Sequence, residues 1–400
     1  MFRMFRIRIY LDYASLTPID PRVIREMKKF SASKYANPSS WYKEGVAAKE
    51  AMESARKTVA TNLRAHSDEI IFTSGGTEAN NLAILGAYNE VKKRGVERPH
   101  IIISNIEHSS IIEVANTLEK NGCEVTRLCV NSEGLISIDE LKKAIRPNTF
   151  LVSIMTVNNE IGSIQPIREI AKVIRNTRKD KYPLFHTDAA QALSVVDINM
   201  ENLGVDMMTI DAGKIYGPRG IGALYTRRGT PIGPVIYGGG QESGMRSGTE
   251  NLPSIAGFAK AMELVVCERK TRDVEEEVRS KEGADSFRSM MITGLKEIDP
   301  NIKVNGPTDT EKVSPNILNV NIPGIDNEFL VLQLDAKGIA CSTKSSCLLD
   351  AGESYVLKAI GAKSSESVRF SFGRWTKKME VKRTLKVIKS ILSRDRAQFA

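Results

Sequence analysis

The 400-residue sequence is poor in the residues that build disulfide frameworks and metal sites. It contains four histidines and five cysteines, namely Cys123, Cys129, Cys267, Cys341 and Cys347. An odd and sparse set of cysteines in a long chain argues against a disulfide framework and indicates a reducing compartment, so we expect a cytoplasmic protein. No two cysteines have the CxxC spacing of a zinc site, and we expect no bound metal.

Long apolar runs are also missing. The longest, around Phe150–Met155, is far shorter than the ~20 residues of a membrane-spanning helix, so we expect no membrane association. The first 15 residues alternate arginine with apolar residues, which predicts a short strand and not a signal peptide. The net charge of +9 permits acidic or nucleic-acid partners, but over 400 residues it indicates a solvated basic surface. Direct nucleic-acid binding is therefore not expected.

Short apolar runs alternate with helical patterns from about Asp68 to Ala223. The predicted strands lie at 69–73, 100–104, 150–156 and 183–187, and the predicted helices begin near 78, 109 and 167. Strands separated by helices of this length predict an α/β fold with a mostly parallel sheet and an active site beyond the carboxyl ends of its strands.

The pattern changes after about Cys267. A charged stretch predicts one long helix over 269–297, and strand-like segments follow at 317–322 and 367–372. Further helices are predicted near 327–337 and over the basic residues 377–394. This succession predicts a second, smaller α+β domain.

Polar residues follow the predicted strands one after another. Gly76 and Thr77 stand between a strand and a helix, where backbone amides and a hydroxyl can form an anion cradle or a simple capped turn. The other strands are followed by His108, Asn159, Asp188, Gln191 and Lys214. Each has an ordinary explanation alone, such as a helix cap or a surface lysine. Together they match the requirements of a pyridoxal phosphate enzyme: a phosphate site, a ring partner, an acid and a lysine that forms a Schiff base.

The sequence resembles the NifS/IscS-type cysteine desulfurases, which are pyridoxal 5'-phosphate enzymes of the class V aminotransferase fold (fold type I). The resemblance runs through nearly the whole chain in the family's order, including YANPSS, FTSGGTEANN, EHSS, VNNEIG, HTDAAQ, KIYGPRGIGALY, GGGQESGMRSGTEN, IACSTKSSC and VRFSFGRWT. It implies a large cofactor domain over 16–265, with helices on both faces of the sheet. The small domain would combine 1–15 with 266–400.

The resemblance also implies roles for individual residues. Lys214 corresponds to the Schiff-base lysine, Asp188 to the partner of the pyridine nitrogen, and His108 to the residue that stacks on the ring and moves protons. The remaining cofactor contacts would be Gly76, Thr77, Asn159 and Gln191, together with Thr249, which would reach the phosphate of a second subunit and so implies a homodimer. Substrate contacts would be Asn37, Asn159 and Arg369, the last as a fork for the substrate carboxylate.

Cys347 corresponds to the family's nucleophile. Its thiolate would attack the sulfur of L-cysteine, release L-alanine and retain the sulfur as a persulfide, and Lys344 can favour the thiolate. The sulfur would pass to an acceptor such as an iron–sulfur scaffold or a tRNA-thiolation enzyme. Cys341, six residues earlier, stands where the family has an apolar residue; we interpret it as a core residue, with a redox or relay role as the alternative.

The sequence departs from the family at the phosphate site and in the cysteine loop. Asp211 and Gly213 replace a Ser and a His that donate to the cofactor phosphate, and two like charges about 4 Å apart cost roughly 1–4 kcal/mol at surface-like dielectrics. We expect weakened cofactor affinity unless the Asp211 carboxylate turns away or Arg246 compensates it. The loop after Cys347 is about one residue shorter than usual. Two alternatives follow: a degenerate homologue that binds partners, or a selenocysteine lyase.

Overall fold

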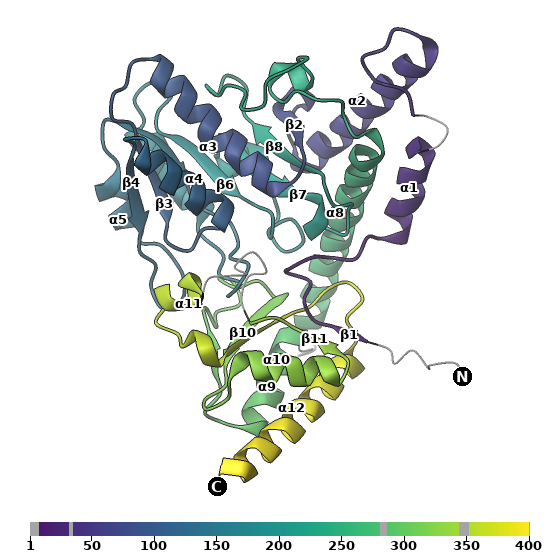
Figure 1. Ribbon diagram of the computed structural model, residues 1–400, viewed down its shortest axis with the longest axis vertical. Helices are drawn as coiled ribbons and strands as arrows, with labels where there is room; N and C mark the ends of the chain where they lie inside the picture. The colour runs from purple at the N-terminus through teal and green to yellow at the C-terminus, as the bar shows by residue number, and fades with distance from the viewer. Residues whose placement is uncertain (1–7, 32–34, 281–285, 344–351, 400) are drawn as a thin grey trace.

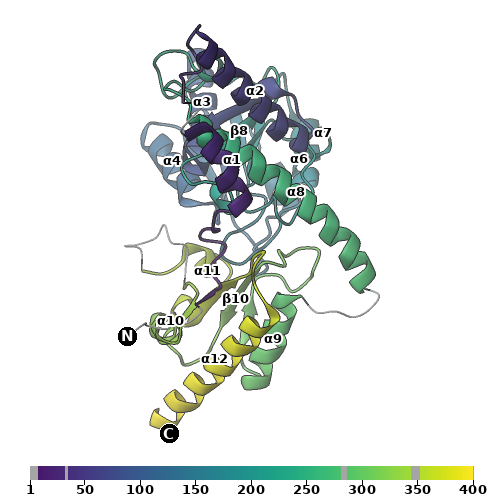
Figure 2. The same cartoon turned by 90° about the vertical axis from the view of Figure 1, so that its right-hand side faces the viewer.

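The computed structural model describes residues 8–31, 35–280, 286–343 and 352–399 (Figure 1). The chain forms a large lobe around a seven-stranded sheet and a smaller lobe that contains both ends of the described chain (Figure 1). The long helix α8 (Leu252–Ser280) starts against the large lobe and extends toward the smaller one (Figure 2).

The large sheet has the strand order β2–β8–β7–β6–β5–β3–β4. In that order the strands are Ile70–Thr73, Gly222–Thr226, Met207–Asp211, Leu184–Asp188, Thr149–Ser153, His100–Ser104 and Glu124–Leu128. Only β8 runs antiparallel to its two neighbours, and the other adjacent pairs are parallel. The prediction of a mostly parallel α/β sheet is confirmed.

Helices cover both faces of this sheet because its buried strands alternate between two cores. In β2, Ile70 and Phe72 belong to one core and Ile71 to the other. The first core also contains residues of α1 (Pro21–Ser31), α2 (Lys43–Leu63), α5 (Ile138–Ala144), α6 (Ile167–Thr177), α7 (Met200–Leu203) and α8. The second contains residues of α3 (Gly76–Lys93) and α4 (Ser109–Lys120).

The smaller lobe has its own core. Its antiparallel sheet has the order β12 (Ser367–Ser371), β10 (Ile317–Asn321) and β9 (Lys303–Asn305), and the helices α9 (Phe287–Ile298), α10 (Asn327–Ala336) and α12 (Lys378–Phe399) complete the lobe. The strand β1 (Ile9–Tyr10) pairs in parallel with β11 (Ile339–Ala340). The start of the chain thus pairs with a strand of the C-terminal lobe. The division into domains over 16–265 and over 1–15 with 266–400 stays a prediction.

The prediction of one helix over 269–297 is wrong. Helix α8 begins at Leu252, because its first half is apolar and packs into the large core, and it is followed by a separate helix α9. Ser286 caps α9 by accepting a hydrogen bond from the Ser289 amide at 3.2 Å, which starts a new helix inside the charged stretch.

Within the described residues, no helix combines the length and apolar character that a bilayer span requires. The same part of the chain contains no group of three or more His, Cys, Asp or Glu side chains arranged to hold a metal ion.

Candidate active site

A cavity of about 240 Å³ lies beyond the carboxyl ends of the parallel strands. It is lined by Ala14, Ser15, Gly76, Thr77, Asn80, His108, Ser110, Met155, Val157, Asn159, Asp188, Ala190, Gln191, Asp211, Lys214 and Arg369. The structure therefore brings together, from five strand ends and the smaller lobe, eight residues that the sequence assigned to the site, and Asp211 beside them.

Asp188, the last residue of β6, is buried and faces the cavity. Its Oδ2 accepts a hydrogen bond from Asn80 Nδ2 at 2.8 Å, and its Oδ1 accepts one from the Ala190 amide at 2.9 Å. These two donors fix the direction in which the carboxylate points. Asn80 has no chemistry of its own in the sequence pattern, and only its place on the sheet-facing side of α3 gives it this contact.

His108 is the N-cap of α4, and its Nδ1 accepts a hydrogen bond from the Ser110 amide at 3.2 Å. The Ser110 hydroxyl lies 2.8 Å from the same nitrogen and accepts a hydrogen bond from Asn80 Nδ2 at 2.8 Å. Because Nδ1 accepts the backbone proton, the neutral imidazole carries its own proton on Nε2. A chain of polar groups thus connects His108 to Asp188 through Ser110 and Asn80.

Lys214 follows β7 in a short 3₁₀ turn, and its amine donates to the carbonyls of Ser15 at 2.6 Å and Ala14 at 3.2 Å. Gln191 Nε2 also donates to the Ala14 carbonyl, at 2.8 Å. The N-terminal segment therefore positions the amine through its backbone. The sequence pattern gave no sign of this role, because a carbonyl oxygen belongs to every residue type.

Arg369 enters the cavity from β12 of the smaller lobe and is only 1% exposed. Its guanidinium donates to Asp12 Oδ1 at 2.9 Å, to Ser15 Oγ at 2.7 Å and to the Asn159 carbonyl at 2.9 Å. A buried arginine needs such partners, because an unpaired charge inside a protein is strongly destabilising. The Arg369 guanidinium is therefore held beside the cavity in a fixed orientation.

Glu107, directly before His108, is fully buried beneath the cavity. Its Oε1 accepts hydrogen bonds from the Met155 amide at 3.0 Å and from the Ser104 hydroxyl. Burial raises the pKa of this carboxyl to about 8, and the negative charge of Asp188 adds to the increase. Its backbone carbonyl also accepts a hydrogen bond from the Tyr355 hydroxyl at 2.6 Å, which fastens helix α11 (Tyr355–Ala359) to this strand end.

The chain matches the family described as aminotransferase class-V over residues 9–384. It is 41% identical over 392 residues to a cysteine desulfurase IscS of Dictyoglomus turgidum, which covers 97% of this chain and 95% of the relative. Among solved structures, a NifS-like protein is similar with a TM-score of 0.87 and 36% identity, covering 97% of this chain and all of that one (100%). A structure of SspA in complex with cysteine is similar with a TM-score of 0.74 and 33% identity, over 91% and 98% of the two chains.

The chain belongs to the NifS/IscS-type cysteine desulfurases of the aminotransferase class-V family. The resemblance stated from the motifs is thereby confirmed, and so is its implication of a cysteine desulfurase with this fold. Enzymes of this family depend on pyridoxal phosphate. We call the part of the cavity formed by Asp188, His108 and Lys214 the ring end. It suits that group, because it offers a fixed carboxylate, an imidazole and an amine.

One end of the cavity, formed by Gly76, Thr77 and Asp211, differs from the family pattern; we call it the phosphate end because the family resemblance implies that the phosphate binds there. Asp211 points toward Gly76 and does not turn away, since its Oδ2 accepts a hydrogen bond from the Gly76 amide at 2.9 Å. Arg246 does not compensate the charge, because its guanidinium pairs with Glu78 at 2.8 Å and 3.3 Å. The structure therefore shows neither of the two features, a carboxylate turned away or a compensating Arg246, that would offset the expected weakening of cofactor affinity.

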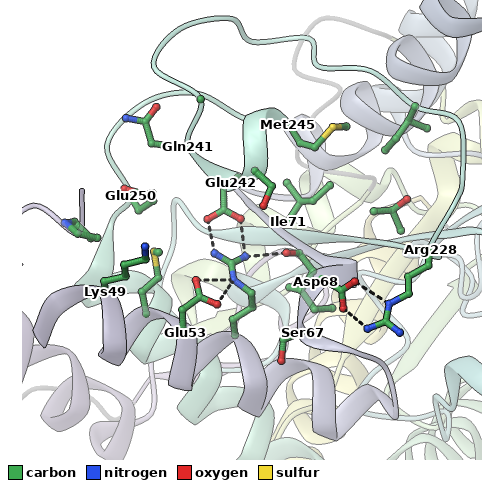
Figure 3. A pocket seen from close by; sticks show the side chains of 18 of the residues that line it. Lys49, Glu53, Ser67, Asp68, Ile71, Arg228, Gln241, Glu242, Met245 and Glu250 are labelled. Carbon is green, nitrogen blue, oxygen red and sulfur yellow. Dashed lines mark hydrogen bonds and ion pairs between the residues drawn. The ribbon is translucent and has the colours of Figure 1, made fainter. Parts of the chain in front are cut away.

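Two residues assigned to the site lie elsewhere in the single chain. Asn37 and Thr249 are exposed and do not line the cavity. Their neighbours Pro38, Ser39 and Glu250 line a second cavity of about 800 Å³ at the large lobe, shown in Figure 3.

The proposed nucleophile Cys347 and its neighbour Lys344 lie outside the described residues. On one side of them, the Ser342 carbonyl accepts a hydrogen bond from the amide of the cavity residue Arg369 at 2.7 Å. On the other side, Ser354 Oγ donates to Oε2 of Glu160, the residue after Asn159, at 2.6 Å. Cys341 packs at the edge of the small core, and burial together with the charge of Asp12 raises the pKa of its thiol to about 12. Its environment is that of a core residue and disfavours a thiolate.

Proposed function

We propose that this cysteine desulfurase binds pyridoxal 5'-phosphate in the 240 Å³ cavity, converts L-cysteine to L-alanine there and retains the sulfur as a persulfide on Cys347. The observation that supports this most is the convergence of Lys214, Asp188, His108 and Arg369 on one cavity. When bound, pyridoxal phosphate supplies an aldehyde that joins primary amines and a ring that accepts electrons from the joined substrate.

Each residue at the ring end would have a different chemical role. Asp188 would hold the pyridine nitrogen with the carboxylate that Asn80 and Ala190 orient. The Lys214 amine would join the cofactor and then hold and return a proton at the substrate's α-carbon. His108, whose Nδ1 is kept as an acceptor by Ser110, would move a proton through Nε2.

Arg369 would bind the carboxylate of L-cysteine through its two terminal nitrogens. Because Asp12 and Asn159 already hold the guanidinium, little side-chain entropy is lost on binding. The substrate would replace the contact with Ser15 or add to it. The substrate carboxylate would thus be held at one fixed place on the cavity wall.

The sulfur step uses the Cys347 thiolate as nucleophile. A bond forms between its sulfur and the substrate sulfur while the carbon–sulfur bond of the substrate breaks. The electron pair of the broken bond stays on the carbon, which takes up a proton and becomes the methyl group of L-alanine. The persulfide then passes its outer sulfur to an acceptor protein in the cytoplasm, such as an iron–sulfur scaffold or a tRNA-thiolation enzyme.

We further propose that two copies form the working unit. The segments that contain Asn37 and Thr249 both line the second cavity, through Pro38, Ser39 and Glu250. Large side chains beside these segments are exposed, with Tyr35 at 83%, Trp41 at 97% and Tyr237 at 75%. Exposed aromatic side chains on these segments favour an interface, and a second copy on this face would bring Thr249 toward the partner's phosphate site.

One experiment tests the function. The protein is purified with pyridoxal phosphate, its visible absorbance is recorded, and L-cysteine is added with a reductant while alanine and sulfide are measured. We expect equal amounts of both products, loss of the absorbance in Lys214→Ala, and retained absorbance without turnover in Cys347→Ser. No absorbance in the wild type would favour a degenerate binding protein, and turnover of selenocysteine alone would favour a lyase.

A further inference from the structure

The Asp211 carboxylate bridges two backbone amides at the phosphate end of the cavity. Its Oδ2 accepts from Gly76, the first residue of α3, at 2.9 Å, and its Oδ1 accepts from Gly213 at 2.7 Å. A negative group at a helix N-terminus is favourable, because the free amides and the helix dipole both attract anions. The chain therefore supplies an anion of its own where the family binds a phosphate.

Glycines surround this carboxylate closely. A Cβ atom added at Gly76 would lie 3.3 Å from Asp211 Oδ2, and one added at Gly75 would lie 3.4 Å from it. A Cβ at Gly213 would lie 3.1 Å from Asp211 Oδ1 and 3.1 Å from Leu16 Cδ1. The two departures from the family pattern thus fit one another, since a side chain at position 213 would crowd the carboxylate unless it shifted by a few tenths of an ångström.

The nearby cations are engaged with other acceptors. Arg246 pairs with Glu78, whose Oε2 also accepts from the Ser74 amide at 2.9 Å. Lys214 donates to the carbonyls of Ala14 and Ser15. The N-terminus of α3 therefore holds two carboxylates, those of Asp211 and Glu78.

We propose that Asp211 is an internal anion that occupies the phosphate cradle and lowers the preference of the cavity for the phosphorylated form of its cofactor. The proposal rests on the proposed function, because it concerns the same cavity. An incoming phosphate must displace the carboxylate from the Gly76 amide or share the cradle with it, and like charges in one cradle repel. Unphosphorylated pyridoxal avoids this competition.

The test is a binding experiment on the full-length protein freed of cofactor. Pyridoxal phosphate and pyridoxal are each titrated into the wild type, Asp211→Asn and Asp211→Ser, with dissociation constants taken from absorbance and tryptophan fluorescence. Asp139→Asn removes the same charge from a side chain that is 79% exposed and serves as the control. Melting temperatures without cofactor verify that each variant is folded.

We expect the preference for pyridoxal phosphate over pyridoxal to rise at least about tenfold in both Asp211 variants, equivalent to about 1.4 kcal/mol, and to stay unchanged in the control. The gain should come from tighter pyridoxal phosphate binding. An unchanged preference in folded variants, with both ligands bound, overturns the role of Asp211 and leaves the proposed function standing. If no variant binds either ligand, both proposals fail.

Discussion

Asn80 donates hydrogen bonds from one amide nitrogen to the Asp188 carboxylate and to the Ser110 hydroxyl, both at 2.8 Å. This single side chain of α3 therefore ties the acid at the end of β6 to the group that orients His108 at the start of α4. A buried amide in this position couples two elements that both line the cavity.

We predict that Asn80→Ala weakens binding of pyridoxal phosphate by about 10- to 100-fold, because a buried carboxylate loses a donor worth roughly 1.5–3 kcal/mol. The dissociation constant is measured by absorbance titration. Asn81→Ala is the matched control, since the neighbouring side chain is partly exposed and donates to the Thr77 carbonyl, away from Asp188. Equal affinities of the two variants would contradict the prediction.

A second prediction concerns substrate binding. Arg369→Lys keeps the charge and loses the two-pronged fork, so KM for L-cysteine should rise at least about tenfold while kcat falls less. Arg288→Lys provides the control, because Arg288 is also buried and donates to the carbonyls of Ile317 and Pro307, away from the cavity. A comparable KM increase in both variants would show that the effect is structural.

The raised pKa of Glu107 predicts a dependence of stability on pH. The folded protein holds a proton on this carboxyl up to a pKa of about 8, whereas the unfolded chain releases it at an ordinary value. Stability is therefore fully present below the unfolded pKa and is lost as the pH rises toward 8, by up to about 1.4 kcal/mol per unit.

Glu107→Gln removes the titratable carboxyl group and keeps a side chain of nearly the same size and shape. Urea unfolding between pH 5.5 and 8 should show the wild type losing stability relative to Glu107→Gln as the pH rises. Because the other groups titrate alike in both proteins, the difference between the curves isolates this carboxyl. Parallel curves would mean that Glu107 is ionised in the folded protein across this range.

Two ion pairs beside the second cavity should differ sharply in their effect on stability (Figure 3). Glu242 accepts two hydrogen bonds from Arg56, and the two side chains are 2% and 9% exposed. Asp68 and Arg228 form a similar pair with both side chains more than half exposed, at 60% and 57%. Glu242→Ala should lower the free energy of unfolding by about 3–5 kcal/mol and Asp68→Ala by less than about 1 kcal/mol, measured by denaturant unfolding.

The sequence predicted the large sheet and the cavity well, for a physical reason. Parallel strands place their carboxyl ends at one edge, so residues such as His108, Asp188 and Lys214 can be assigned to one site from their position after a strand. The long helix over 269–297 was predicted wrongly. Charge alone does not show where a helix starts, whereas the apolar residues after Leu252 and the cap at Ser286 do.

Contacts made through backbone atoms or neutral side chains could not be predicted from the sequence. The carbonyls of Ala14 and Ser15 bind the Lys214 amine because β1 joins the other end of the chain, a contact across about half of the sequence that no local pattern encodes. Asp211 was recognised as a departure from the family pattern. Its direction, however, depends on the Gly76 and Gly213 amides that it meets in the fold.

The most direct test of the proposed persulfide mechanism is the location of the sulfur after reaction with L-cysteine. The protein is mixed briefly with L-cysteine, alkylated, digested with trypsin and examined by mass spectrometry. Lys344 lies between Cys341 and Cys347, so cleavage after it separates the two cysteines into different peptides. We expect one additional sulfur atom on the Cys347 peptide, none on the Cys341 peptide, and none anywhere in Lys214→Ala. Additional sulfur on Cys341, or alanine formation without additional sulfur on Cys347, would contradict this mechanism.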